Sequence, residues 1–205
     1  MTDKMKAVVL AAGFVILLGG AALTYKSLGK DNPPPIAIAE NEGDVSRGEG
    51  DGDSDGDGDG DEDKNKDKMK APDFSVLDWD GNTLRLSDFL GTPVILNFWA
   101  SWCPPCKSEM PEFDAVYREV GEGIAFIMVD LTDGQRETAA MGKKFITDQG
   151  FSFPVYFDTE LEAAYAYSIQ SIPTTLFIDR DGYLIAGAQG AIDEAALRKG
   201  IGLIQ

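Results

Sequence analysis

Hydrophobic and polar positions divide the chain into three zones. The first zone contains residues 7–25, a 19-residue apolar stretch that carries no charged side chain. As a helix it would span roughly 28 Å, close to the thickness of the hydrocarbon core of a bilayer. No polar face interrupts the stretch, which argues against a buried core helix of a globular domain. We therefore assign residues 1–30 to an N-terminal transmembrane anchor.

Lys4 and Lys6 precede the apolar stretch, and this favours an N-terminus inside the cell and a C-terminal part outside. A cleaved signal peptide is the alternative. However, the A-x-A sequence at residues 37–39 lies beyond three prolines and far from the apolar end. The apolar run is also longer than the apolar region of a signal peptide, which has about 7–15 residues. The pattern favours a retained single-pass anchor in the cell membrane, with an extracytoplasmic C-terminal domain.

The second zone, residues 31–70, contains almost nothing that could be buried. It begins with a proline run, and residues 40–63 carry 12 acidic side chains against a single arginine. The resulting net charge of −11 is most of the chain's −17. Such a composition predicts a disordered, self-repelling linker. The negative charge also argues against nucleic acid as a partner.

The linker also matches the pattern of the EF-hand calcium loop, at Asp51, Asp53, Asp55 and Glu62. A Gly-Asp repeat produces this pattern by composition alone, and neither flank has the pattern of an amphipathic helix. A solvated spacer is the favoured interpretation. Loose cation condensation and a dedicated calcium site are the alternatives, and the latter would make the chain a calcium-responsive binding module.

The third zone, residues 71–205, has the length and pattern of one α/β domain. Short strands at 74–77 and 83–86 flank the turn residues Asp80-Gly81-Asn82 and predict a hairpin. A β-α-β-α unit, a short helix, a second hairpin and a last helix are expected after it. The expected strands are 94–99, 124–129, 174–179 and 183–188, and the expected helices are 108–120, 135–149, 161–167 and 192–201.

The candidate chemistry lies directly after the 94–99 strand, in Trp102-Cys103-Pro104-Pro105-Cys106. A helix N-terminus is electropositive and has free N–H groups, so it stabilises a thiolate at Cys103, which we expect to be exposed. The spacing lets Cys106 reach that sulfur and form a disulfide. With two cysteines and no histidine, the chain cannot build a zinc site or a His-based triad. A static disulfide in so small a loop adds little stability, so a redox-active pair is favoured.

With these residues the domain resembles the thioredoxin superfamily, in particular the TlpA/ResA-type membrane-anchored thiol-disulfide oxidoreductases. The resemblance implies a thioredoxin fold with an N-terminal β-hairpin extension and no cofactor. Peroxiredoxins share the opening of the domain but place a threonine three residues before the attacking cysteine, where this chain has Ala100. The motifs that carry the resemblance include Ala71-Pro72-Asp73-Phe74, Leu86-Ser87-Asp88-Phe89, Asn97-Phe98-Trp99-Ala100, Trp102-Cys103-Pro104-Pro105-Cys106 and Ile172-Pro173-Thr174.

The resemblance also implies roles for single residues. Cys103 would attack a partner disulfide, and Cys106 would resolve the mixed disulfide. Pro173 matches the family's cis-proline, and Ile172 would offer backbone groups to a substrate strand. The substrate-binding residues expected in this way are Trp102, Pro104, Pro105, Ile172, Pro173 and Thr174.

Proton transfer needs a separate group, because Asn97 stands where cytosolic thioredoxins carry a buried aspartate. The resemblance implies that Glu109 takes this part as a third catalytic residue, and an ordinary surface glutamate is the alternative. The function expected is disulfide exchange with proteins outside the membrane. A reductase fed by a membrane thiol-reducing protein, as in cytochrome c maturation, is favoured, since the oxidising C-P-H-C form has a histidine that is missing here. A disulfide oxidase or isomerase of secreted proteins is the alternative.

Overall fold

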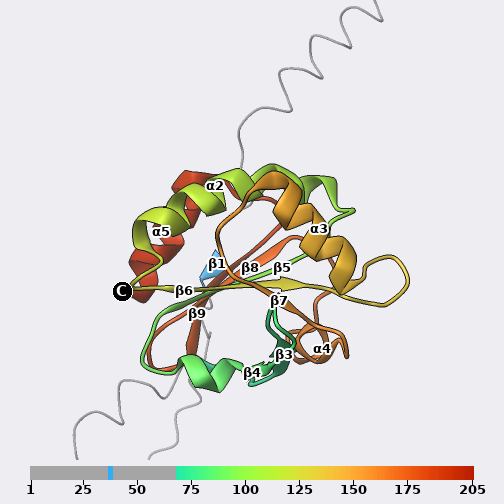
Figure 1. Cartoon of the computed structure of the whole chain (residues 1–205). Helices are drawn as coiled ribbons and strands as arrows, with labels where there is room; N and C mark the ends of the chain where they lie inside the picture. The colour runs from blue at the N-terminus through green and yellow to red at the C-terminus, as the bar shows by residue number, and fades with distance from the viewer. Residues whose placement is uncertain (1–36, 39–67) are drawn as a thin grey trace, which may run out of the picture. The chain divides into compact units, whose positions relative to one another are not determined.

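The computed structural model describes residues 37–38 and 68–205 (Figure 1). The helices are α2 (Pro104–Val120), α3 (Ala139–Gln149), α4 (Glu162–Ala166) and α5 (Glu194–Ile204), with a 3-10 turn at Leu86–Phe89. The strands are β1 (Ala37–Ile38), β2 (Met69–Lys70), β3 (Ser75–Leu77), β4 (Thr83–Arg85), β5 (Val94–Trp99), β6 (Ala125–Asp130), β7 (Val155–Phe157), β8 (Thr174–Ile178) and β9 (Tyr183–Gln189).

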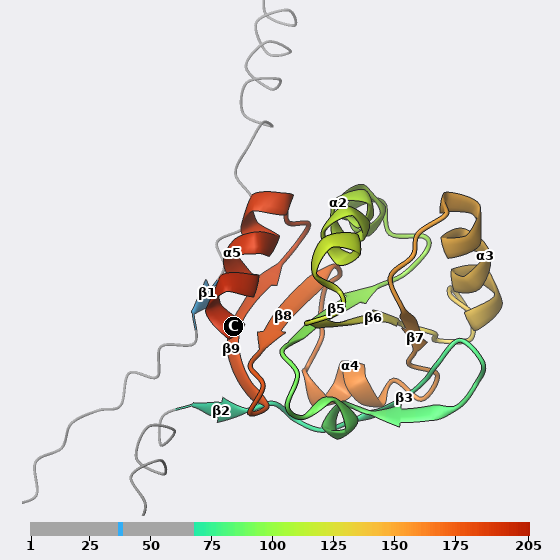
Figure 2. The same ribbon diagram turned by 60° about the vertical axis from the view of Figure 1, so that its left-hand side comes forward.

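Within these residues the strands form one mixed sheet in the order β1-β9-β8-β5-β6-β7-β3-β4, and β2 also pairs with β9. Helices α2, α3 and α5 cover one face, while α4 and the β3–β4 hairpin lie on the other (Figures 1 and 2). All six side chains of the central strand β5 are buried. They alternate between the two cores, so that Asn97 and Trp99 face the side of the three helices.

The predicted thioredoxin-type arrangement is confirmed. Strand β5 leads through α2 to the parallel strand β6, and the antiparallel hairpin β8–β9 leads into α5. The β3–β4 hairpin is the expected N-terminal extension, and it joins the sheet through one pair between Leu77 and Phe157. The C-terminal end of β5 therefore lies in the middle of the sheet, directly before α2.

Helix α3 begins later than the predicted residue 135. The Asp133 carboxylate accepts hydrogen bonds of 2.7–2.9 Å from the backbone N–H groups of residues 135–137. These residues form a closed loop around that carboxylate, and α3 begins only after Thr138, whose hydroxyl accepts from the Met141 N–H. Apolar periodicity did not reveal this because a capping side chain, not burial, sets the boundary.

Strand β7 was not predicted, because the apolar pattern indicated no strand between α3 and α4. Its three residues are all buried, and they pair in parallel with β6. A three-residue apolar run is too short for periodicity to identify. Leu86, expected at the end of a strand, begins the 3-10 turn instead.

Two pieces of the predicted linker belong to the sheet. Met69 and Lys70 pair with β9, and Ala37 and Ile38 pair with β9 as well. Among the described residues, no helix has the length and apolar character to span a membrane. The predicted anchor at residues 7–25 and the calcium-loop match at residues 51–62 lie outside the described residues.

Candidate active site

The cysteine pair lies where β5 ends and α2 begins. Cys103 is the N-cap of α2, and its Sγ accepts a hydrogen bond of 3.2 Å from the Cys106 N–H. Pro104 and Pro105 occupy the first two helical positions, where a missing N–H leaves no intrahelical bond unmade. Cys103 and Cys106 form a disulfide across a Cα–Cα distance of 5.3 Å. The disulfide predicted from the spacing is present.

Cys103 is far less accessible than expected. Its side chain is 2% exposed in this disulfide form, and that of Cys106 is fully buried. The Ile172 carbonyl oxygen lies 3.7 Å from the Cys103 Sγ, because the loop before β8 folds against the cysteine pair. The difference between the two sulfurs is therefore one of position, since Cys103 precedes the helix and Cys106 lies inside its first turn.

The loop that faces the cysteines contains a cis peptide bond between Ile172 and Pro173. The cis form predicted for Pro173 is therefore present. The Pro173 carbonyl accepts from the Gly190 N–H at 2.8 Å, which fixes the loop to the end of β9. The Thr174 hydroxyl donates to the Ser171 carbonyl at 2.8 Å, so this side chain serves the loop itself.

The other residues expected to bind substrate surround the pair differently. Trp102, Pro104 and Pro105 are exposed beside Cys103, and Ile172 is half-buried. The structure thus brings five of the six together around the cysteine pair, while the side chain of Thr174 is turned away into its own loop. Their part in binding a substrate stays a prediction.

Glu109 is buried, which excludes the alternative of an ordinary surface glutamate. Its side chain is 2% exposed. Oε1 accepts from the Asn97 side-chain amide at 2.9 Å, and Oε2 accepts from the Ile192 N–H at 3.0 Å. Asn97 stands where cytosolic thioredoxins carry a buried acid. It thus binds the carboxyl group of Glu109, which follows Cys106 by about one turn of α2.

Burial raises the pKa of Glu109 to about 7, because water no longer stabilises the charged form. The hydrogen bonds from Ile192 and Asn97 lower the pKa and limit the rise, while the nearby charge of Glu112 adds to it. Both protonation states are therefore populated at neutral pH. Such a carboxyl group is suited to accept the Cys106 proton during resolution.

Glu109→Gln is expected to slow resolution of the mixed disulfide by about tenfold or more, while the fold is retained. The inflection near pH 7 in the pH–rate profile of disulfide exchange should disappear, because the amide cannot titrate. Stopped-flow rates between about pH 5 and 9 measure this. Glu119→Gln, which changes an exposed carboxylate on the same helix, is the matched control. A Glu109→Gln profile identical to that of the unchanged protein would show that water handles the proton.

Two further buried acids near the pair were not found from the sequence. Glu137 is fully buried, and its Oε2 accepts from both the backbone N–H and the hydroxyl of Ser101, each at 2.8 Å. Asp130 is also fully buried, beside Trp99 on the neighbouring strand. The position of both acids in the sequence could have identified them. They follow or end β6, and the ends of β5 and β6 lie side by side because the two strands are parallel.

Asp130 differs from Glu109 in having no hydrogen-bond partner for either carboxylate oxygen among the described residues. Burial raises its pKa to about 9, and the charges of Glu137 and Asp133 contribute to the rise. The carboxyl group is therefore neutral at pH 7. Across residues 37–38 and 68–205, no cluster of three or more potential ligand side chains is arranged to hold a metal ion.

The comparisons with known proteins agree with this geometry. The model of the AhpC/TSA family matches residues 68–186. The chain belongs to this family. It is 32% identical over 136 residues to the thiol-disulfide oxidoreductase ResA of Bacillus subtilis (strain 168), across 66% of this chain and 74% of the relative. The predicted activity is thereby confirmed, and the protein is a thiol-disulfide oxidoreductase.

Two solved structures support the same fold. StoA from Bacillus subtilis is 26% identical with a TM-score of 0.57, and the match covers 64% of this chain and 97% of StoA. The exposed lipoprotein thioredoxin Etrx1 of Streptococcus pneumoniae strain TIGR4 is 31% identical with a TM-score of 0.57, covering 63% of this chain and 98% of that one. Both matches are of the thioredoxin-like type that the sequence predicted.

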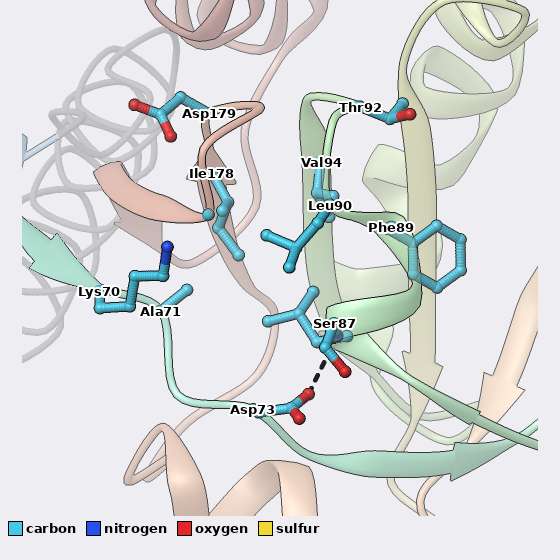
Figure 3. Close-up of a pocket in the computed structure, with 12 residues that line it drawn as sticks. Lys70, Ala71, Asp73, Ser87, Phe89, Leu90, Thr92, Val94, Ile178 and Asp179 are labelled. Carbon is cyan, nitrogen blue, oxygen red and sulfur yellow. Dashed lines mark hydrogen bonds between the residues drawn. The ribbon is translucent and has the colours of Figure 1, made fainter. Parts of the chain in front are cut away.

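A pocket of about 310 Å³, drawn in Figure 3, is lined by neither cysteine. Val94, the first residue of β5, lines it, whereas Cys103 lies in the turn beyond Trp99, the last residue of that strand. Five residues of extended strand separate the two ends by roughly 16 Å. Leu90 and Ile178 point toward each other across the pocket in Figure 3, and its lining is mostly apolar. The pocket therefore lies at the end of β5 that is remote from the cysteines, and we assign it no part in the disulfide chemistry.

Proposed function

We propose that the protein is a membrane-anchored, extracytoplasmic reductase of protein disulfides that receives its electrons from a membrane thiol-reducing protein. The Cys103 thiolate attacks one sulfur of a partner disulfide, and the other partner sulfur leaves as a thiolate. Cys106 then loses its proton, attacks the Cys103 sulfur and releases the second partner thiol. The partner gains two electrons, and the membrane thiol-reducing protein then reduces the Cys103–Cys106 disulfide.

The proposed direction of electron flow, from this protein to its partner, rests on the surroundings of Cys103. Within the described residues its sulfur accepts one backbone N–H, from Cys106, because Pro104 and Pro105 have none. Burial to 2% exposure further disfavours a charged sulfur. Strongly oxidising pairs owe their high potential to a stabilised reduced form. The N-terminus of α2 thus stabilises a Cys103 thiolate less than the sequence led us to expect, and a less stabilised dithiol is a better electron donor, which favours a reductase.

The reduction potential tests this direction. We expect the full-length protein, equilibrated in glutathione or dithiothreitol buffers, to have a potential below about −200 mV, on the side of thioredoxins and glutaredoxins. Alkylation of free thiols followed by mass measurement gives the oxidised fraction. A value near about −120 mV, typical of a strong oxidant, would instead favour an oxidase or isomerase of secreted proteins.

The proposed location rests on the apolar stretch at residues 7–25 and the lysines before it. The pneumococcal structure described as an exposed lipoprotein offers support by analogy. The anchor we propose is the apolar stretch itself, as a membrane-spanning helix. Protease added to intact protoplasts should remove the folded domain and leave a membrane-bound stub. Complete protection of the domain, or a mature N-terminus after residue 25, would contradict the proposal.

A further inference from the structure

The loop between β6 and α3 holds the residues that precede Cys103. Two consecutive residues of this loop, Arg136 and Glu137, contact two consecutive residues of the active-site turn, Trp102 and Ser101. The guanidinium carbon of Arg136 lies 3.7 Å from the centroid of the Trp102 ring, so the planar cation lies against the aromatic face. Both residues are exposed, and Trp102 directly precedes Cys103 in the chain.

The position of Arg136 is fixed from both sides. Asp133 binds the backbone N–H groups of residues 135–137, and the Gly134 N–H, at a φ of 73°, donates to the Glu137 carbonyl at 2.9 Å. The buried Glu137 carboxylate then binds Ser101 through its N–H and hydroxyl. The loop cannot slide along the active-site turn without breaking these bonds, so the guanidinium is pre-organised on Trp102.

This cation is free to meet a partner. Within residues 68–205, Arg85, Arg118 and Arg198 each form an ion pair, while Arg136 has none. Of the acids in its own loop, Asp133 binds backbone N–H groups through Oδ1 and interacts with Arg136 by charge without forming an ion pair, and Glu137 binds Ser101. Trp102 covers one face of the guanidinium and leaves its N–H edges available to a carboxylate.

The charge of the domain makes this position selective. Residues 68–205 contain 11 lysines and arginines against 20 acidic residues, a formal net charge of −9. An acidic peptide is therefore repelled by most of the surface, and a fixed cation beside the nucleophile decides where it can dock. Lys107, also exposed, lies in the first turns of α2 with its ammonium group over the ring of Phe145.

We propose that Arg136, held over the Trp102 ring, is a specificity-determining residue that selects partner proteins with an acidic side chain next to their reactive cysteine. The inference rests on the disulfide exchange described above. The partner carboxylate would bind the guanidinium while the partner sulfur lies over Cys103. Arg136 takes no part in the transfer of electrons or protons.

The probes for this proposal are three peptides that differ at one residue beside a single cysteine: Glu, Gln or Lys. Each cysteine is blocked as a 2-pyridyl disulfide. The reduced full-length protein attacks the peptide sulfur through Cys103 and releases 2-thiopyridine, and Cys106 then frees the peptide thiol, so the protein loses two electrons and the probe disulfide gains them. The rate of 2-thiopyridine release is divided by that with dithiothreitol, which removes differences in intrinsic reactivity.

We expect the Glu peptide to react about fivefold faster than the Lys peptide at low salt, with the Gln peptide between them. The ratio should approach one at about 0.5 M salt, where exposed charges are screened. Arg136→Ala should reduce the ratio below about twofold, because the Glu-peptide rate falls more than the Lys-peptide rate. Arg180→Ala is the matched control, because Arg180 is the other arginine of residues 68–205 without an ion pair and lies in the distant β8–β9 turn.

An unchanged ratio in Arg136→Ala would overturn the proposal. An equal loss of the ratio in Arg180→Ala would also overturn it, because net charge and not the Trp102 platform would then be responsible. Failure of the proposed reductase function would be distinguishable, since it would appear in the reduction potential and would leave the peptide ratio intact.

Discussion

Cys106→Ser is expected to stop turnover completely and to leave partner proteins covalently attached to Cys103. The structure gives this asymmetry a cause other than the exposure we first expected, because both sulfurs are buried in the disulfide form. Cys103 precedes the helix and lies beneath the Ile172 carbonyl, where a partner strand would pass, whereas Cys106 is enclosed in the first turn of α2. A partner sulfur therefore reaches Cys103 first, and only Cys106 can displace it.

Non-reducing electrophoresis of cells or mixtures containing Cys106→Ser should reveal higher-mass species that disappear with dithiothreitol. Cys103→Ser is the matched control, which should be inactive and trap nothing. Because serine has nearly the shape of cysteine, both variants should keep the fold, which circular dichroism can verify. Equal trapping by the two variants would show that the roles of the cysteines are wrongly assigned.

Much of the fold could be predicted because it depends on burial. Strand β5 was expected at residues 94–99 and is found there, since an uninterrupted apolar run of six residues is typical of a strand covered on both faces. The cysteine pair was found because its chemistry is local and resides in a short motif, whereas the cis form of Pro173 followed from the resemblance. Glu109 needed the resemblance, since nothing in one helix sequence distinguishes a buried glutamate from a solvated one.

The features that were missed depend on contacts between distant segments. Glu137 is an unremarkable residue in a polar loop until the parallel pairing of β5 and β6 brings Ser101 beside it. The burial of Cys103 depends on the loop before β8, some seventy residues later. Such contacts are set by topology, which apolar periodicity constrains only loosely.

Asp130→Asn is expected to remove a fall in stability between about pH 7 and 9. Burial raises the pKa of Asp130 from 3.8 to about 9, so the folded state holds a proton that the unfolded state releases. A group with a raised folded pKa makes stability decrease as pH rises from the unfolded value to the folded one. Within that window one such group costs about 1.4 kcal/mol of unfolding free energy per pH unit. Glu109 contributes in the same direction, but only up to its pKa of about 7.

The surroundings of Asp130 explain why its ionisation in the folded protein is unfavourable in free energy. Trp99 lies beside it on β5, and Gly142 of α3 packs so closely that a Cβ at that position would collide with the carboxylate. The two charges that raise its pKa further, those of Glu137 and Asp133, are both negative. Ionisation would thus place an unpaired charge in the core beside a like charge, which burial and repulsion both oppose.

Urea unfolding of the full-length protein, followed by Trp fluorescence at intervals from about pH 5 to 9, separates the two buried acids. The unchanged protein should lose stability throughout, Glu109→Gln should lose less below about pH 7, and Asp130→Asn should be nearly flat above it. Asp130→Asn should therefore gain the most stability relative to the unchanged protein at about pH 9. A parallel pH dependence in Asp130→Asn and the unchanged protein above pH 7 would mean that Asp130 ionises in the folded state with water or another group beside it. In that case the fully buried, unpartnered carboxyl group would not be the source of the pH-dependent stability.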